Sequence, residues 1–455
     1  MTSTQDQDFD YAIVGGGAAG TILAIRLLQD APKDARIALI EAGELGRGVA
    51  YGSDNPAHVL NVPAGGMSMF AERPNDFVDF LINRDGGADP AAFMPRRDYA
   101  AYLAQRLSEA RTASQAQFLQ LRSHVLRVMP QGDDDGVALT LTLADGSQHR
   151  AKRVALTPGN RPRKTPFDND GDPRVLSAWD HAGLEQLRRD DQVVVVGSGL
   201  SMVDVVLGLQ ARGHQGGITV VSRHGLLPLP HAAKKQAVDV DIASFAAQGL
   251  RQRVRTLRTI ARRLDAQDQP WQSLMDALRH HVRELWQSLS DVDQRRFLRH
   301  VVRYWDVHRH RIPREVSTRL RSLQESGALQ VIPGRVKAAM GRQDHLSIEV
   351  AQRLIGSEIL QADWVVNATG IETRALHFPN PMLQQLLEDG HARPGPHGLG
   401  IDTNEAGDVI DASGATSARL AAIGSLRLGN LWETTAVPDL REDAARLAKR
   451  WLFQA

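Results

Sequence analysis

The segment Tyr11-Ala-Ile-Val-Gly-Gly-Gly-Ala-Ala-Gly20 decides the fold, because an apolar strand runs directly into the spacing G-x-G-x-x-G. Apolar residues at helical spacing continue to Leu28, and Pro32 then interrupts them. The segment Arg36–Ile40 is typical of a second strand. This order of strand, glycine turn, helix and strand is the context in which the spacing predicts a dinucleotide-binding unit.

The glycines, and the acid that follows the second strand, indicate which cofactor binds there. Gly15 permits the tight turn, Gly17 lets a pyrophosphate approach the backbone, and Gly20 lets helix and strand pack closely. The free N–H groups at the start of the helix attract phosphate. Glu41 comes 21 residues after Gly20, where a carboxylate binds the hydroxyls of an adenosine ribose and repels a 2′-phosphate. The unit is therefore predicted to bind FAD or NAD, and not NADP.

A second glycine loop follows Val193–Val196, an apolar run typical of a strand that is buried on both faces. Gly197 and Gly199 occupy the first two glycine positions, whereas Met202 replaces the third. A side chain at that position predicts a looser contact between helix and strand. The loop still predicts a second dinucleotide site.

The next strand of this second unit ends differently from the strand before Glu41. Ser222 and Arg223 follow the apolar residues 218–221. A hydroxyl and a guanidinium suit the 2′-phosphate of NADPH, because arginine binds phosphate through paired hydrogen bonds. We therefore favour NADPH over NADH at this loop. The alternative is that Arg223 is only a solvated residue at a strand end.

Both glycine loops are followed, far along the chain, by alternating strands and then by an apolar strand that ends in a glycine turn. These turns are Thr157-Pro-Gly159 and Asn367-Ala-Thr-Gly370. The repetition indicates two versions of one module. A last apolar strand ends at Gly424, and a helix begins after Thr434. The N-terminus of that helix is suited to face the pyrimidine end of a flavin and stabilise its reduced anion.

The composition restricts the function further. The chain has 455 residues and no cysteine. Disulfides, thiolate metal sites, iron–sulfur clusters, a cysteine nucleophile and a redox-active thiol pair are therefore excluded. No apolar run is long enough for a membrane span, and residues 1–10 are too polar and acidic for a secretory or transit signal. We expect a cytoplasmic enzyme that acts on a small molecule.

Residues 242–327 have a helical pattern almost free of glycine, which predicts a helical subdomain inserted in the second unit. Residues 251–321 contain 17 Arg, no Lys and 8 acidic residues. The acids are interspersed with the arginines, and few aromatic residues accompany them. We therefore interpret these arginines as solvated helix faces and not as a nucleic-acid surface.

Within this insert, residues 304–313 carry four candidate residues for substrate binding and proton transfer. Arg309 or Arg311 is suited to an anionic substrate or to the NADPH phosphate. His308 or His310 is suited to proton transfer. Histidines two apart do not share a helix face, so we expect no metal site. The alternative is a solvated helix end that a proline stops.

Together these patterns predict an α/β protein with two Rossmann-like dinucleotide-binding domains and a helical insertion. The expected first part of the FAD-binding domain is residues 1–165, and its C-terminal part is residues 366–455. The expected NAD(P)H-binding domain is residues 166–365, with the insertion at about 240–328.

Four stretches resemble the signature of the bacterial FAD/NAD(P)-binding oxidoreductase family, one of the two-domain flavoprotein groups that include flavin-dependent monooxygenases. They are Gly46-Arg-Gly-Val-Ala-Tyr-Gly52, Pro56-Ala-His-Val-Leu-Asn-Val-Pro-Ala-Gly-Gly-Met-Ser68, Val221-Ser-Arg-His-Gly225 and Glu433-Thr-Thr-Ala-Val-Pro438. The resemblance covers nearly the whole chain, and it implies bound FAD with NADPH or NADH as electron donor. It also implies that Asn61, Met67 and Ser68 lie near the flavin, because the loop after Glu41 folds over the cofactor in this family.

Within this family the chain is similar in length and layout to FAD-dependent urate hydroxylases. That resemblance implies a monooxygenase that hydroxylates a small polar substrate with molecular oxygen through a flavin C4a-hydroperoxide. The main expectation is that the enzyme converts urate to 5-hydroxyisourate in urate degradation. Near relatives N-hydroxylate amines or amino acids, which is the first alternative, and a plain NAD(P)H–flavin reductase is the second. An RNA-binding flavoprotein is a third alternative, from a different class of function. The sequence chooses neither the catalytic residues nor the oligomeric state.

Overall fold

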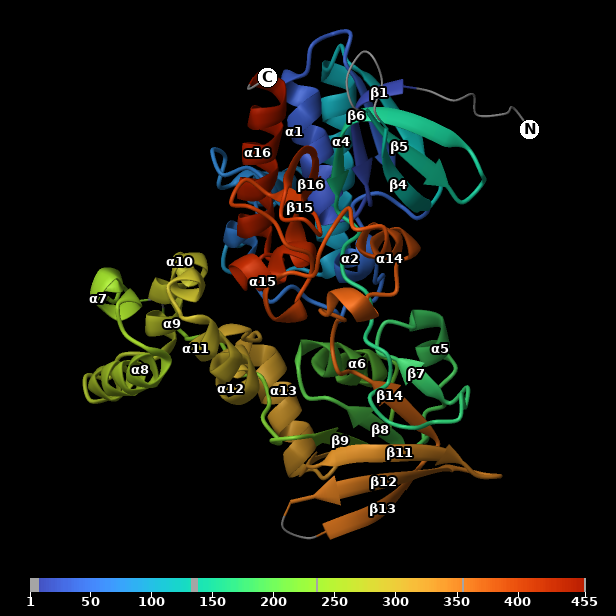
Figure 1. Ribbon diagram of the computed structural model, residues 1–455. Coiled ribbons are helices and arrows are strands. Elements are labelled where there is room, and N and C mark those ends of the chain that lie inside the picture. Colours follow the sequence, from blue (N-terminus) through green and yellow to red (C-terminus); the bar gives the residue numbers. More distant parts are fainter. Residues whose placement is uncertain (1–7, 132–137, 235, 354–355, 454–455) are drawn as a thin grey trace. The chain divides into compact units, whose positions relative to one another are not determined.

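The computed structural model describes residues 8–131, 138–234, 236–353 and 356–453. The contacts divide the chain into two units, whose elements are labelled in Figure 1. Unit 1 comprises Met1–Pro56, Val62–Arg161 and Glu372–Ala455, and unit 2 comprises Ala57–Asn61 and Pro162–Ile371. Each unit holds a parallel sheet with helices, so the predicted α/β class with two dinucleotide-binding modules is confirmed.

Unit 1 is built on an eight-stranded sheet with the order β15-β16-β6-β1-β2-β3, to which β4 and β5 add through β6. The glycine-loop strand β1 pairs in parallel with β2 on one side and with β6 on the other. Antiparallel β4, β5 and β6 form the predicted meander. The strands are β1 Asp8–Val14, β2 Arg36–Ile40, β3 Gln117–Leu121, β4 Val125–Gln131, β5 Ala138–Leu143, β6 Gln148–Leu156, β15 Asp408–Ile410 and β16 Thr416–Ala422.

The helix after the first glycine loop is held firmly in unit 1. Helix α1 packs against α4 and α16, and eight of its residues are buried, from Gly20 to Leu28. This burial fixes the end of the helix that faces the glycine loop. The helices of unit 1 are α1 Ala18–Asp30, α2 Gly48–Tyr51, α3 Asp76–Asp85, α4 Arg96–Ala113, α14 Pro381–Glu388, α15 Leu428–Leu431 and α16 Val437–Phe453, with short 3-10 turns at Ala64–Gly66, Ala375–His377, Pro396–Gly398 and Gly424–Arg427.

Unit 2 contains a five-stranded parallel sheet with the order β10-β9-β8-β14-β7, and a separate antiparallel sheet of β11, β12 and β13. The second glycine-loop strand β8 lies between β9 and β14, as β1 lies between β2 and β6. The elements are β7 Val175–Ser177, β8 Val193–Val196, β9 Ile218–Ser222, β10 Leu329–Pro333, β11 Arg335–Gly341, β12 Leu346–Gln352, β13 Gly356–Ala362, β14 Trp364–Asn367, α5 His181–Glu185, α6 Leu200–Ala211 and α13 Arg314–Glu325.

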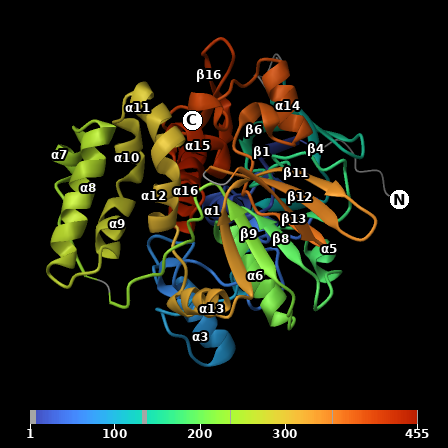
Figure 2. The ribbon, with the colours of Figure 1, turned by 90° about the horizontal axis from the view of Figure 1, so that it is seen from below.

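The predicted helical insert follows β9 and has a small core of its own. Figures 1 and 2 both show α7, α8, α9 and α10 gathered apart from strands β8 and β9. The helices are α7 Ile242–Ala246, α8 Leu250–Asp265, α9 Gln272–Arg279, α10 Val282–Gln287, α11 Asp291–Arg296 and α12 Val302–Arg309, with a π-helical turn at Phe297–Val301. Their buried core contains Phe245, Leu264, Leu274, Met275, Leu278 and Leu285.

The insert ends earlier than the expected position near residue 328. Helix α13 packs against β10 of the parallel sheet, and its Leu320 is buried in the core of that sheet. Helix α13 therefore belongs to the dinucleotide module, as the crossover between β9 and β10. No helix among the described residues is long and apolar enough to cross a membrane.

Candidate functional site

The first glycine loop adopts a backbone that only glycine accommodates at two positions. Gly15 has φ +105°, and a Cβ atom there would lie 2.2 Å from the carbonyl oxygen of Thr157. A Cβ atom on Gly20 would lie 1.9 Å from the carbonyl oxygen of Gly15. The Thr157 hydroxyl also binds the loop, since its Oγ1 lies 2.7 Å from the Gly15 oxygen. The glycine spacing therefore has the steric cause expected from the sequence.

At the start of α1 no side chain takes the place that a bound phosphate would occupy. Gly17 is its N-cap residue, no side chain caps the helix, and its first turn carries no acidic residue. A Cβ atom on Gly17 would touch only Gly48, whose Cα is 3.8 Å away. Uncapped N–H groups beside open space form a site for a pyrophosphate.

Two further glycine turns of unit 1 lie at this loop. A Cβ atom on Gly424 would lie 3.9 Å from Cβ of Ala19, in the first turn of α1. The hydroxyl of Ser425 donates to the carbonyl oxygen of Gly159 at 3.1 Å. Gly159 has φ +69°, and no atom lies within 4 Å of its Cβ position. The turns at Gly159 and Gly424 thus join the first glycine loop in one cradle, which fits a dinucleotide.

Glu41 is the residue after β2, and the backbone holds its carboxylate in place. Its Oε2 accepts a hydrogen bond from Gly16 N at 2.8 Å, and its Oε1 accepts one from Gly43 N at 3.0 Å. Each carboxylate oxygen has a further lone pair for a ribose hydroxyl. The predicted contact between Glu41 and the adenosine ribose stays a prediction.

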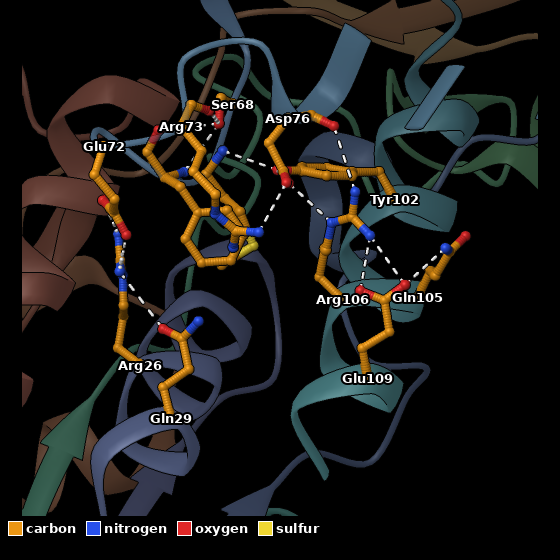
Figure 3. Close-up of polar contacts among 12 residues, drawn as sticks. Arg26, Gln29, Ser68, Glu72, Arg73, Asp76, Tyr102, Gln105, Arg106 and Glu109 are labelled. Atoms are coloured by element: carbon orange, nitrogen blue, oxygen red, sulfur yellow. Dashed lines mark hydrogen bonds and ion pairs between the residues drawn. The ribbon is translucent and has the colours of Figure 1, made fainter. Parts of the chain in front are cut away.

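The structure places Ser68 and Met67 inside unit 1, where both are buried. The Oγ of Ser68 lies 2.7 Å from Arg73 O and 3.0 Å from Phe70 O, and it accepts from Phe70 N at 3.1 Å (Figure 3). Its hydroxyl is therefore used within its own loop. The backbone oxygen of Ser68 accepts from Arg441 Nη1 at 2.8 Å. We expect Ser68 to hold the shape of this loop, and its predicted position near a flavin stays a prediction.

A buried polar network behind this loop keeps it in place. The hydroxyl of Tyr102 donates to Oδ2 of Asp76 at 2.6 Å and accepts from Met69 N at 3.2 Å. Arg106 Nε donates to the same carboxylate oxygen at 2.8 Å (Figure 3). Burial, with the neighbouring Asp76 carboxylate, raises the pKa of Tyr102, which therefore stays a protonated donor.

Thr434 carries a polar atom that the protein leaves unsatisfied. The residue is 1% exposed, and its Oγ1 has no hydrogen-bond partner among the described residues. It lies three residues before α16, whose side packs against α1. A buried hydroxyl without a partner is costly and calls for one from a ligand. The predicted cofactor contact of Thr434 stays a prediction.

The second glycine loop, in unit 2, repeats the backbone of the first. Gly197 has φ +108°, and its Cβ would lie 2.4 Å from the carbonyl oxygen of Ala368. Gly199 is the uncapped N-cap of α6 and has no atom within 4 Å of its Cβ position. Gly370 likewise has φ +93° and open space at its Cβ position. The start of α6 therefore also fits a pyrophosphate.

Met202 is fully buried in the core of unit 2 and takes the position that Gly20 has in unit 1. At Gly20 even a Cβ atom would meet the backbone of the turn. The start of α6 accommodates the Met202 side chain, and the looser contact predicted from the sequence stays a prediction. The turn itself is unchanged, because Gly197 keeps the φ of Gly15 within three degrees.

The residue that follows β9 is positively charged, whereas the residue that follows β2 is negatively charged. Ser198 Oγ donates to Leu226 O at 2.6 Å and lies 2.9 Å from Ser222 Oγ. Arg223 forms no hydrogen bond or ion pair with any residue that the structure describes. Partial burial, and after it the charges of three neighbouring arginines, lower the pKa of Arg223. An anion at this position would relieve that repulsion.

The candidates from the insert do not converge on one site. Arg311 is 4% exposed, forms an ion pair with Asp276 and donates to Gln272 O at 3.3 Å. It is therefore part of the protein interior. His308 donates from Nδ1 to Tyr304 O at 2.7 Å.

Of the other two candidates, His310 places its Nε2 3.8 Å from Oδ1 of Asp306. Arg309 is half-buried on α12. Asn61 lies in unit 2, where its backbone oxygen accepts from Nε2 of His231 at 2.9 Å. The predicted position of Asn61 near a flavin stays a prediction. No group of three or more His, Asp or Glu side chains in the described ranges is arranged to hold a metal ion.

Comparison with known proteins agrees with this geometry. Residues 12–161 match the family model described as FAD-NAD(P)-binding. This is the segment that holds the first glycine loop, Glu41 and Gly159, so the predicted family resemblance and the FAD/NAD(P) cofactor class are confirmed there. No curated protein matches the chain.

Several solved structures share the fold over nearly the whole chain. An ornithine N-hydroxylase from Kutzneria sp. 744 is 17% identical with a TM-score of 0.68, covering 98% of this chain and 99% of that chain. L-Lysine 6-monooxygenase from Pseudomonas syringae is 16% identical with a TM-score of 0.67, covering 97% and 99%. A cadaverine monooxygenase from Erwinia amylovora, bound to FAD, is 12% identical with a TM-score of 0.67, covering 98% and 95%. These likenesses confirm the α/β fold with two Rossmann-like units.

Proposed function

We propose that this chain is an FAD-dependent, NADPH-utilising monooxygenase that N-hydroxylates an amine or amino acid. The observation that carries the cofactor assignment is the contrast between two glycine loops of the same backbone. One is followed by the carboxylate of Glu41 and the other by Ser222 and Arg223. A carboxylate suits an unphosphorylated ribose, and a guanidinium suits a 2′-phosphate.

The substrate class differs from the first expectation from the sequence. The similar structures described above are named for the hydroxylation of ornithine, lysine and cadaverine, all of them amines. They support the N-hydroxylase alternative better than hydroxylation of urate. A free amine offers a nucleophilic nitrogen lone pair, which is what an electrophilic oxygen atom requires.

Residues of unit 1 would hold the FAD. The uncapped start of α1 would bind the pyrophosphate, Glu41 the adenosine ribose, and the orphan hydroxyl of Thr434 a polar group of the cofactor. When bound, the flavin supplies the redox chemistry by which NADPH and oxygen are used to hydroxylate a substrate. The protein supplies binding, orientation and exclusion of water.

The absence of cysteine separates the chain from another group that shares its fold. The solved structure of bacillithiol disulfide reductase from Staphylococcus aureus is 14% identical to this chain with a TM-score of 0.58, and the match covers 98% of each of the two chains. A disulfide reductase that relays electrons through a thiol pair needs cysteine, and this chain contains none. The fold therefore supports both classes of enzyme, and the sequence favours the monooxygenase.

The test combines flavin content with product analysis. The purified, FAD-loaded protein is mixed in air with NADPH and, in turn, ornithine, lysine, cadaverine and urate. We expect one of the amines to accelerate NADPH oxidation and to yield a hydroxylamine. Consumption of urate together with NADPH would instead restore the urate hydroxylase interpretation. NADPH oxidation that yields only hydrogen peroxide throughout would support a plain oxidase or reductase.

A further inference from the structure

We propose that helix α12 of the insert completes the binding site for the 2′-phosphoadenosine end of NADPH, with Arg303 as a phosphate ligand and Tyr304 as a stacking surface for adenine. The inference rests on the proposed function, because that function names NADPH as the electron donor. It assigns to the insert a role in dinucleotide recognition.

Arg335 directly follows the residue that is hydrogen-bonded to the end of β9. Strand β9 ends at Ser222, which is in register with Pro333 of β10. Gly334 N then donates to Ser222 O at 2.8 Å. Arg335 follows directly as the first residue of β11. Arg223 therefore follows Ser222 in the chain, and Arg335 follows the residue that is hydrogen-bonded to Ser222.

Helix α12 contacts the residues that follow β9. The ring centroids of His224 and Tyr304 are 6.0 Å apart, with the ring planes at 41°. Arg303 precedes Tyr304 on α12, and its Nη1 binds Oδ2 of Asp306 at 3.0 Å. This ion pair fixes one edge of the guanidinium on the helix, while the remaining N–H groups can bind an anion.

The side chains around Arg223 carry an excess of positive charge. The side chains of Arg223 and Arg335 form no hydrogen bond or ion pair among the described residues. Arg303, Arg335 and Arg163 are close enough to lower the pKa of Arg223, after its partial burial. Arginine keeps its charge in proteins, so the repulsion persists until an anion binds. A phosphomonoester dianion, which accepts paired hydrogen bonds, is the ligand this cluster fits.

An aromatic surface lies next to these arginines. Tyr304 is 52% exposed, which makes it one of few large apolar side chains on the described surface. Burial, together with Arg223, Arg303 and Arg335, lowers the pKa of His224, so its ring is neutral at neutral pH. The rings of Tyr304 and His224 beside a phosphate site offer a stacking surface for a purine base.

Isothermal titration calorimetry of the FAD-loaded protein tests this assignment without turnover. The probes are 2′,5′-ADP, which carries the 2′-phosphate, and 5′-ADP, which lacks it. Arg303→Gln is expected to weaken 2′,5′-ADP binding about tenfold or more, and to change 5′-ADP binding about twofold or less. Tyr304→Ala is expected to weaken both probes by a similar factor, because both contain adenine. Arg319→Gln, an exposed arginine on α13, is the control with the same loss of charge.

Two further variants separate a direct role of Arg303 from an indirect one. Arg303→Gln removes the arginine partner of Asp306, whose carboxylate would then repel phosphate. The double variant Arg303→Gln/Asp306→Asn removes that repulsion, so full recovery of 2′,5′-ADP binding would overturn a direct role for Arg303. If Arg303→Gln misfolds, Arg303→Lys keeps the charge without the planar guanidinium, and a partial loss of 2′,5′-ADP affinity is then expected.

The outcomes separate this inference from the proposed function. If Arg303→Gln binds 2′,5′-ADP as Arg319→Gln does, while Arg223→Gln loses the affinity, the role of α12 is overturned and NADPH use stands. If the unaltered protein binds 5′-ADP as tightly as 2′,5′-ADP, the NADPH assignment fails as well. Selective loss in both Arg303→Gln and Arg223→Gln is the result that supports the inference.

Discussion

The steric role of Gly20 gives the sharpest test of the FAD module, through the substitution Gly20→Ala. The added Cβ would lie 1.9 Å from the carbonyl oxygen of Gly15, and Cβ atoms essentially never approach closer than 3.0 Å. Helix α1 and the turn must therefore separate by about 1.1 Å, the difference between these distances. The obstacle is backbone, so no side-chain rotation relieves it.

The cost follows from how α1 is packed. Eight residues of α1 are buried, and the helix lies against α4 and α16. Overpacking of a core typically costs 1–3 kcal/mol, and a backbone obstacle places Gly20→Ala at about 3 kcal/mol or more. For a unit of this size that corresponds to a fall in melting temperature of roughly 6–12 °C. The same displacement moves the uncapped start of α1, so FAD affinity should fall as well.

The assay compares Gly20→Ala with Gly87→Ala, the same chemical change at a position of unit 1 that has no atom within 4 Å. Thermal unfolding is followed with and without added FAD, and bound flavin is measured from the visible absorbance of the purified protein. We expect a large fall in both quantities for Gly20→Ala only. Equal melting temperatures and flavin contents for the two variants would refute the steric account of this loop.

Three other changes test the same unit. Glu41→Ala removes the acceptor for Gly16 N and Gly43 N and the predicted ribose contact, so largely flavin-free protein is expected on purification; protein that retains its full flavin absorbance would contradict the ribose role. Thr434→Val removes a hydroxyl that has no partner within the described protein. Because that unsatisfied hydroxyl is costly, the free energy of unfolding of the flavin-free protein should rise by about 1–3 kcal/mol, while the Kd for FAD rises about fivefold or more; an unchanged Kd would argue against a cofactor contact. The hydrogen bonds from Arg26 lower the pKa of Glu72 to about 2 from an ordinary value of 4.5. A depressed carboxyl pKa stabilises the fold above the unfolded pKa, and that stability is lost as the pH falls from about 4.5 to 2. Arg26→Gln should therefore flatten the pH dependence of the unfolding free energy in this window, and an unchanged slope would mean that the exposed pair contributes nothing.

The parts of the fold that the sequence predicted are those set by local physics. The two glycine loops follow from steric contacts within one strand–turn–helix segment, and both appear with nearly the same φ at Gly15 and Gly197. The buried strand Val193–Val196 was predicted from its uninterrupted apolar run and lies in the centre of its sheet. The charge contrast between Glu41 and Arg223 was visible because each directly follows a strand.

The parts that were not predicted depend on contacts between distant segments. Arg303 and Arg335 join Arg223 only because β10 pairs with β9 and α12 meets His224, and no local pattern shows this. Helix α13 has the same helical periodicity as the insert, and that periodicity does not show that α13 packs on β10 of the parallel sheet. Likewise, a short segment such as Ala57–Asn61 carries no sequence signal that places it in unit 2.

The central claim is that this flavoprotein transfers one oxygen atom to an amine with electrons from NADPH. The most direct test supplies isotopically labelled dioxygen to the FAD-loaded protein with NADPH and the amine that most accelerates NADPH oxidation. Mass spectrometry of the product should show a hydroxylamine that carries one labelled oxygen atom, in a fixed ratio to the NADPH consumed. An unaltered amine, with all of the label recovered in hydrogen peroxide, would contradict the account.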